Sequence, residues 1–171
     1  MFMHNGNIAH WGSVKRRLAV SVSERWFNVV HGNTDSEWAF ALFLDSLEKE
    51  GLDPENHIYV DKGFGHSALR RALLKTIERI NDFVGQVSVN EHTSEDAAER
   101  SLLNFAMTDG HSVVCTKYVN SKTDEAASLY FSSGTNWNFT GDLGQYKMER
   151  KDKGADIVLV ASEPLTFERG T

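Results

Sequence analysis

The chain has 171 residues, 40% of them hydrophobic and 11% aromatic, which is enough for one folded domain with a core. It carries 18 Lys and Arg against 24 Asp and Glu, a net charge of −6. This balance disfavours a nucleic-acid partner, because such binding depends on a basic face. The one cysteine cannot form an internal disulfide and fits a reducing compartment, and the sequence shows neither a secretory leader nor a membrane-length apolar stretch. We therefore expect a cytoplasmic protein.

The first residues combine an apolar pair with a polar, glycine-containing segment. Phe2 and Met3 precede His4-Asn5-Gly6-Asn7-Ile8, which predicts a short strand that ends at Met3 and a turn beside a pocket. The side-chain amide of Asn5 and the backbone amide of Gly6 could supply two converging donors to a developing oxyanion. An ordinary Asn-Gly turn is the alternative, and this pair of residues alone favours it.

Three helices are expected in the first half of the chain. A short one covers residues 13–22, and a longer one begins at Thr34-Asp35-Ser36-Glu37, which has the form of a capping box, and ends at Gly51. A third covers residues 67–84, with Gly85 beyond its end. Asp35 in a first helical turn could simply cap the helix, as the motif alone favours, or could bind the α-ammonium group of an amino-acid substrate.

The spacing of the hydrophobic residues changes from helical to strand-like in the second half of the chain. Residues 90–99 are polar and predict a surface turn, after which residues 103–108 and 112–119 predict two strands around a tight Asp109-Gly110 turn. Residues 127–132, 145–149 and 156–162 predict further strands. Helices followed by antiparallel strands indicate one continuous domain with an α+β layered fold, in which a single antiparallel sheet includes residues 1–3 and packs against the helices.

Two motifs together resemble those of the class II glutamine amidotransferases: a His-Asn-Gly-x-Ile element, and a Thr-Asp-Ser-Glu helix start some thirty residues later. Further segments are similar to the fungal subgroup, which includes the amidotransferase subunit of a cytosolic glutathione-degrading complex. They read MHNGNIA at 3–9, GNTDSEWAFALFL at 32–44, YVNS at 118–121, SLYFSSGT at 128–135 and VASEPL at 160–165. The resemblance implies the αββα layered fold of N-terminal-nucleophile hydrolases, with antiparallel sheets and helices on the outer faces.

Carried over residue by residue, the resemblance makes Asn5 and Gly6 the oxyanion hole. It makes Asp35 the carboxylate that binds the substrate's α-amino group, with Thr34 and His4 in the same substrate-binding motifs and a structural role expected for His4. The family's N-terminal cysteine, its Gly-Asp-Gly-type segment and its arginine strand have no counterpart here. We therefore expect residues 1–171 to be part of a type-2 amidotransferase domain that lacks its nucleophile segment and is also cut at its C-terminus.

Cys115 lies in a predicted strand and has neither a neighbouring histidine nor the α-amine that serves as base in this class, so an apolar strand residue is expected. The histidines show no metal-ligand spacing, and neither a metal nor a cofactor is expected.

Two functions follow as alternatives. The first is hydrolysis of the γ-glutamyl amide of glutamine, or of a γ-glutamyl peptide such as glutathione, by a protein that could be a subunit of a glutathione-degrading complex. The second is a non-catalytic binding or scaffold protein that keeps the fold. Whether this chain is itself an enzyme, and which acceptor receives the ammonia, stays open. Neither a nucleic acid nor a membrane is expected as a partner.

Overall fold

The structure, a computed structural model, describes residues 1–56, 58–91, 99–139, 146–149 and 154–164. The chain divides into two compact units, Met1–Ala126 and Ala127–Thr171, called unit 1 and unit 2 and described separately here. After one N-terminal strand, helices occupy the chain as far as Glu91 and strands follow, and every strand pair in the described residues is antiparallel. The α+β class is thereby confirmed.

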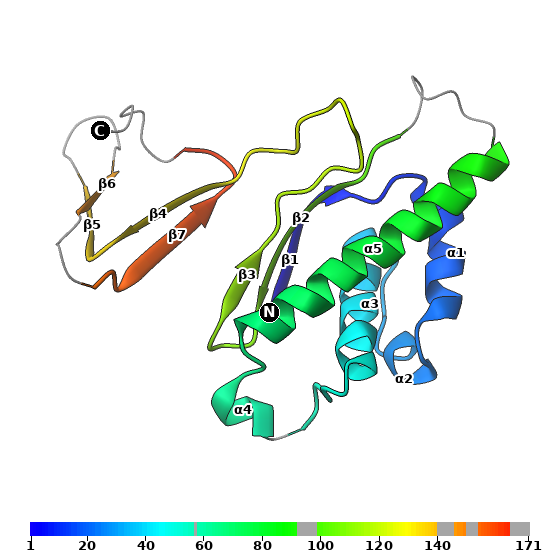
Figure 1. The fold of residues 1–171 in the computed structure, drawn as a ribbon, viewed down its shortest axis with the longest axis horizontal. Coiled ribbons are helices and arrows are strands. Elements are labelled where there is room, and N and C mark those ends of the chain that lie inside the picture. Colours follow the sequence, from blue (N-terminus) through cyan, green and yellow to red (C-terminus); the bar gives the residue numbers. More distant parts are fainter. Residues whose placement is uncertain (57, 92–98, 140–145, 150–153, 165–171) are drawn as a thin grey trace. The chain divides into compact units, whose positions relative to one another are not determined.

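The described residues of unit 1 form a three-stranded sheet and five helices (Figure 1). In chain order the elements are β1 (Phe2–Asn7), α1 (Trp11–Ser21), α2 (Glu24–Phe27), α3 (Asp35–Lys49), α4 (Ile58–Lys62), α5 (His66–Glu91), β2 (Leu102–Thr108) and β3 (Val113–Cys115). The sheet order is β1-β2-β3, so the N-terminal strand pairs with a strand about a hundred positions later in the sequence. Helix α3 contacts β1, and α5 contacts both β2 and β3.

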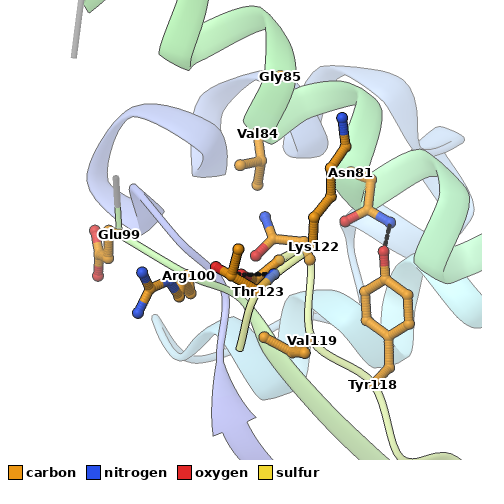
Figure 2. A pocket seen from close by; sticks show the side chains of 11 residues that line it. Asn81, Val84, Gly85, Glu99, Arg100, Tyr118, Val119, Lys122 and Thr123 are labelled. Atoms are coloured by element: carbon orange, nitrogen blue, oxygen red, sulfur yellow. Dashed lines mark hydrogen bonds between the residues drawn. The ribbon is translucent and has the colours of Figure 1, made fainter. Parts of the chain in front are cut away.

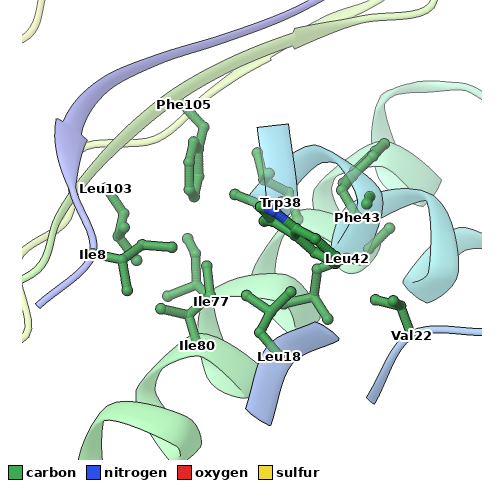
Figure 3. Packing of buried hydrophobic residues seen from close by; sticks show 14 of the residues in the cluster. Ile8, Leu18, Val22, Trp38, Leu42, Phe43, Ile77, Ile80, Leu103 and Phe105 are labelled. Atoms are coloured by element: carbon green, nitrogen blue, oxygen red, sulfur yellow. The ribbon is translucent and has the colours of Figure 1, made fainter. Parts of the chain in front are cut away.

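The core of unit 1 lies between the sheet and the helices, as Figure 3 shows. Successive side chains of a strand point to opposite faces, so Leu103, Phe105 and Met107 of β2 all face the helices and are buried. They meet a cluster that includes Leu42 of α3 and Ile80 of α5. The opposite face of the sheet is exposed at Met1, Met3 and Val113, with relative exposures of 73%, 54% and 65%.

A buried charge ties three helices together. Asp45 of α3 is 1% exposed, and its Oδ2 accepts hydrogen bonds from Lys49 at 2.6 Å and from Arg79 of α5 at 2.7 Å. Its Oδ1 accepts from the backbone amide of Ser23, and Arg79 also donates to the carbonyl of Ser21, at the end of α1. Burial by itself would raise the pKa of Asp45, but these hydrogen bonds hold it below its usual value.

Local signals placed α3 correctly. Thr34 is its N-cap and accepts a hydrogen bond from the backbone amide of Glu37 at 3.3 Å. Gly51, at φ 81°, follows the C-cap. Its amide donates to Glu48, and the amide of Leu52 donates to Leu47, which is the Schellman arrangement that a left-handed glycine permits. The short helix expected at residues 13–22 is also confirmed, as α1.

The predicted end of the third helix was wrong. Helix α5 passes through Gly85 and continues to Glu91. Glycine inside a helix costs up to about 1 kcal/mol relative to alanine. The added turn buries Val87, which is 3% exposed and belongs to the core, and burying a side chain of this kind contributes about 1.5–3 kcal/mol. Tertiary packing therefore outweighs the local signal.

The turn predicted after Met3 was also wrong, because His4, Asn5, Gly6 and Asn7 all belong to β1. Cα pairing runs from Phe2 opposite Met107 to Asn7 opposite Leu102. The ladder with β2 supplies hydrogen bonds that a sequence window around residue 5 cannot reveal. Helices α2 and α4 were not predicted; each has five residues or fewer.

The Asp109-Gly110 turn between β2 and β3 is confirmed, although β3 ends at Cys115 and the pairing continues only as an isolated bridge between Leu102 and Val119. The Asp109 carboxylate holds this turn against residues Phe64 and Gly65, before α5, by accepting hydrogen bonds from their backbone amides. Most of the surface turn predicted at 90–99 lies outside the described residues, while residues 90 and 91 belong to α5.

In unit 2, the residues that the structure describes form two strand pairs. Strand β4 (Tyr130–Gly134) pairs with β7 (Ile157–Ala161), and β5 (Asn136–Phe139) pairs with β6 (Tyr146–Glu149). Three of these strands were predicted, with β4 shifted towards the C-terminus, and β5 was not. The strands form three separate sheets in the described residues, so the single sheet expected from the sequence was wrong.

Candidate functional site

The residues His4, Asn5 and Gly6 lie on β1, where alternate side chains point to opposite faces of the sheet. Gly6 has φ 150°, and a Cβ at this position would overlap the backbone oxygen of Leu102. Only glycine fits this close approach between β1 and β2. Asn5 is exposed, so its amide is accessible from solvent on the face that the helices leave uncovered.

His4 points to the other face and joins three elements. Its Nε2 lies 3.0 Å from the carbonyl oxygen of Leu102, its Nδ1 lies 3.0 Å from Ser36 Oγ, and its ring packs 4.7 Å from that of Phe105. A carbonyl oxygen only accepts, so Nε2 donates to Leu102, while Nδ1 and the Ser36 hydroxyl share a hydrogen bond. His4 thus fixes the start of α3 against β1 and β2, in agreement with the structural role expected for it.

Asp35 lies at the start of α3 and binds the end of β1. Its Oδ2 accepts a hydrogen bond from the backbone amide of Ile8 at 2.9 Å, and its Oδ1 accepts from the Ser36 amide at 2.7 Å. The Ser36 hydroxyl lies 3.3 Å from the same Oδ1. The carboxylate is half-buried, and its Oδ2 still has a lone pair for a further donor. The two motifs, some thirty residues apart in sequence, therefore meet through this carboxylate.

Thr34 is exposed and acts as the helix cap described above. The Glu37 carboxylate departs from a capping box, because it accepts from the backbone amides of His31 and Gly32 and not from that of Thr34. These backbone hydrogen bonds lower the pKa of Glu37. The Thr34 hydroxyl accepts a hydrogen bond from the Glu37 amide, as a helix cap does. A role of Thr34 in binding substrate therefore stays a prediction.

The structure brings together His4, Ser36 and Asp35, and it places Gly6 one residue beyond Asn5 on the same strand. Sequence reasoning gave no role to Ser36, although it lies inside the Thr34–Glu37 motif. It also missed Asn104, which pairs with Asn5 across the β1–β2 ladder and therefore shares its face. Asn104 is 6% exposed, and its Oδ1 accepts from the Tyr118 amide at 3.2 Å.

Cys115 lies in β3, as expected, opposite Ala106, which in turn pairs with Met3. It shares the face of Asn5 but lies two strands away and two residues along, a Cα separation of about 12 Å for regular strand spacing. Burial raises the pKa of its thiol. A thiol that resists ionisation is a weak nucleophile at neutral pH, which supports the expectation of a strand residue without a catalytic role.

No group of three or more His, Cys, Asp or Glu side chains with the geometry to hold a metal ion occurs among the described residues. In the same part of the chain, no helix combines the length and the apolar composition needed to cross a bilayer.

Comparison with known proteins gives one strong sequence relative. The chain is 49% identical over 169 residues to a protein of Saccharomyces cerevisiae described as probable glutamine amidotransferase DUG3. The match covers 99% of this chain and 45% of the yeast protein, so the chain spans less than half the length of that relative. No family model matches.

Among solved structures, a glutamine aminotransferase class-II domain protein from Silicibacter pomeroyi matches with a TM-score of 0.49 and 22% identity. This match covers 78% of the chain and 49% of the bacterial one. Because the match to the yeast protein covers 99% of the chain, the aligned region includes both the His4-Asn5-Gly6 strand and the Asp35 helix start. Over nearly its whole length the chain is therefore similar to part of a probable glutamine amidotransferase, and the resemblance expected from the sequence is confirmed.

Proposed function

We propose that this chain supplies the oxyanion hole and the substrate α-amino site of a glutaminase that hydrolyses γ-glutamyl amides. The observation that carries the proposal is the hydrogen bond between Asp35 Oδ2 and the backbone amide of Ile8, which joins the two motifs at the end of β1. Asn5 offers an exposed side-chain amide on the same strand, and Gly6 provides the glycine that the close approach to β2 requires.

In the proposed reaction, a cysteine thiolate attacks the γ-carbonyl carbon and the carbonyl oxygen becomes an oxyanion. The Asn5 side-chain amide and the Gly6 backbone amide donate hydrogen bonds to this oxyanion. The C–N bond then breaks, and the amine leaves with a proton returned by the base, as ammonia from glutamine or as the free amine of the remaining peptide from a γ-glutamyl peptide, giving a thioester. Water attacks the thioester, the thiolate departs, and the γ-carboxylate of glutamate is released.

The Asp35 carboxylate would bind the substrate's α-ammonium group in this scheme. An ammonium has three N–H donors, and Asp35 Oδ2 has one lone pair left after its hydrogen bond to the Ile8 amide. His4 and Ser36 would act as positioning residues, because the Ser36 hydroxyl lies within hydrogen-bonding distance of both the His4 ring and Asp35.

The nucleophile of the family is an N-terminal cysteine whose own α-amine serves as the base. Residues 1–171 hold one cysteine, Cys115, which is internal and has a raised pKa. The proposed reaction therefore belongs to a protein in which a segment beginning with cysteine accompanies these residues, and residues 1–171 would form part of its type-2 amidotransferase domain. We refer to such a protein as the cysteine-bearing form.

We further infer the αββα layering of N-terminal-nucleophile hydrolases. The support comes from unit 1, where helices cover one face of the sheet and the other face exposes Met1, Met3 and Val113. A second sheet on this apolar face would complete the layers.

The proposed substrates are glutamine and γ-glutamyl peptides such as glutathione, and the proposed setting is a cytoplasmic complex that degrades glutathione. These details rest on the similarity to the fungal subgroup. A non-catalytic scaffold is the alternative, and one observation favours it: both oxygens of Asp35 already accept hydrogen bonds from backbone amides, as in a purely structural cap.

Release of glutamate from glutamine and from glutathione by the cysteine-bearing form tests the proposal. We expect turnover on at least one of them, and loss of that turnover when the N-terminal cysteine is changed to serine. A cysteine-bearing form that is folded but releases no glutamate from either compound would favour the scaffold.

A further inference from the structure

The backbone hydrogen bonds of β1 determine which of its amides face β2 and which face the outer edge of the sheet. Met1 and Thr108 exchange two bonds: the Met1 nitrogen donates to the Thr108 carbonyl at 2.8 Å, and the Thr108 amide donates to the Met1 carbonyl at 3.0 Å. In an antiparallel ladder, pairs that exchange two bonds alternate with pairs that exchange none. The amides and carbonyls of Phe2, His4 and Gly6 therefore face away from β2.

The hydrogen bonds of β2 agree with this alternation. Leu103, which lies opposite Gly6, donates its amide to the carbonyl of Tyr118 and so faces away from β1. Figure 2 shows Tyr118 in the segment that follows β3, where its hydroxyl accepts a hydrogen bond from Asn81 of α5. In the part of the chain that the structure describes, β1 is an edge strand of its sheet. Its outer edge thus presents the backbone N–H and C=O groups of His4 and Gly6.

Two groups of the proposed site lie along this outer edge. Gly6, the proposed oxyanion donor, is exposed, and the next outward-facing amide, that of Ile8, donates to Asp35 Oδ2 at 2.9 Å. Two residues of a strand span about 6.8 Å, a length that an extended glutamyl side chain covers. A substrate whose α-ammonium binds Asp35 and whose γ-carbonyl binds Gly6 therefore runs antiparallel to β1. Its leaving group points towards His4.

We propose that the backbone of His4 forms a subsite for the third residue of a γ-glutamyl tripeptide, an inference that rests on the proposed function. From the γ-carbonyl onward such a substrate is an ordinary peptide. In an extended peptide, the carbonyl of one residue and the amide two residues later point to the same side. The third residue therefore donates its N–H to the His4 carbonyl, and its carboxylate accepts from the His4 amide, as in strand addition. Glutamine and γ-glutamyl dipeptides end before this position.

Binding to the cysteine-bearing form, with its N-terminal cysteine changed to alanine so that no substrate is consumed, tests the proposal. The probes are γ-glutamyl-alanyl-glycine and its ester analogue, in which an oxygen replaces the glycine N–H. The readouts are the Kd and the backbone amide signals of Gly6 and His4 in isotope-labelled protein. We expect the tripeptide to shift both signals and to bind about three- to tenfold more tightly than the ester, because the ester lacks one hydrogen-bond donor.

The dipeptide γ-glutamyl-alanine is the matched control, because it offers the same γ-glutamyl amide without the third residue. It should shift the Gly6 signal, leave the His4 signal in place, and bind no more tightly than the ester. If the tripeptide shifted Gly6 but not His4, or if tripeptide and ester bound with equal Kd, the subsite would be overturned and the proposed function left intact. If no probe shifted either amide, the subsite and the proposed function would both be contradicted.

Discussion

Replacing Gly6 by alanine should destabilise the chain, since this position has no room for a side chain. An alanine at φ 150° carries a backbone strain of about 1–3 kcal/mol. The new methyl group also overlaps the Leu102 oxygen, and Leu102 cannot move away without breaking its hydrogen bond to His4, which contributes about 1 kcal/mol. The two effects together predict a loss of about 2–4 kcal/mol in the free energy of unfolding.

Urea unfolding followed by circular dichroism measures this loss, with Gly12→Ala as the matched control. Gly12 lies in α1, and a Cβ there would meet nothing within 4 Å. Alanine in a helix is favoured over glycine by up to about 1 kcal/mol, so the control should be neutral or slightly stabilising. If the free energy of unfolding of Gly6→Ala lay within about 0.5 kcal/mol of that of the unchanged protein, the argument for a close approach at Gly6 would be refuted.

Three further changes probe the buried charge and the cysteine. Arg79→Met should lower the free energy of unfolding by about 3 kcal/mol in urea, because Asp45 is 1% exposed and would keep only Lys49 as a cationic partner. The pKa of Asp45 is lowered in the folded state. Its contribution to the free energy of unfolding is therefore fully present above the pKa of the unfolded state and is lost as pH falls through the pKa of the folded state. Stability measured below about pH 4 should therefore fall less steeply in Asp45→Asn than in the unchanged protein. The 171-residue chain should release glutamate from glutamine at the background rate, and Cys115→Ser should not alter that rate; turnover abolished by this change would contradict the assignment of Cys115 as a strand residue.

Local chemistry was sufficient to predict some elements from the sequence. The start and end of α3 depend on contacts within a few residues, between Thr34 and Glu37 and around Gly51, and both were predicted correctly. The same applies to the Asp109-Gly110 turn. Each of these caps and turns depends on contacts between residues that are close together in the sequence.

Tertiary contacts decided the features that were missed. The continuation of α5 past Gly85 depends on the burial of Val87, and β1 extends to Asn7 because β2 supplies a partner strand. The neighbourhood of Asn5 and Asn104 likewise follows from strand register, which a single sequence does not reveal. For the proposed site, the motifs made Asp35 a candidate, and only the structure connects it to Ile8.

Steady-state kinetics of Asn5→Ala in the cysteine-bearing form test the proposed site most directly, with Asp35→Ala for comparison. The Asn5 amide would bind most strongly when the oxyanion forms, so its loss should lower kcat on the order of 10²–10³-fold with little change in KM. The Asp35 carboxylate would contact the α-ammonium in ground and transition states alike, so its loss should mainly raise KM. If Asn5→Ala raised KM alone and left kcat unchanged, the assignment of Asn5 to the oxyanion hole would be contradicted.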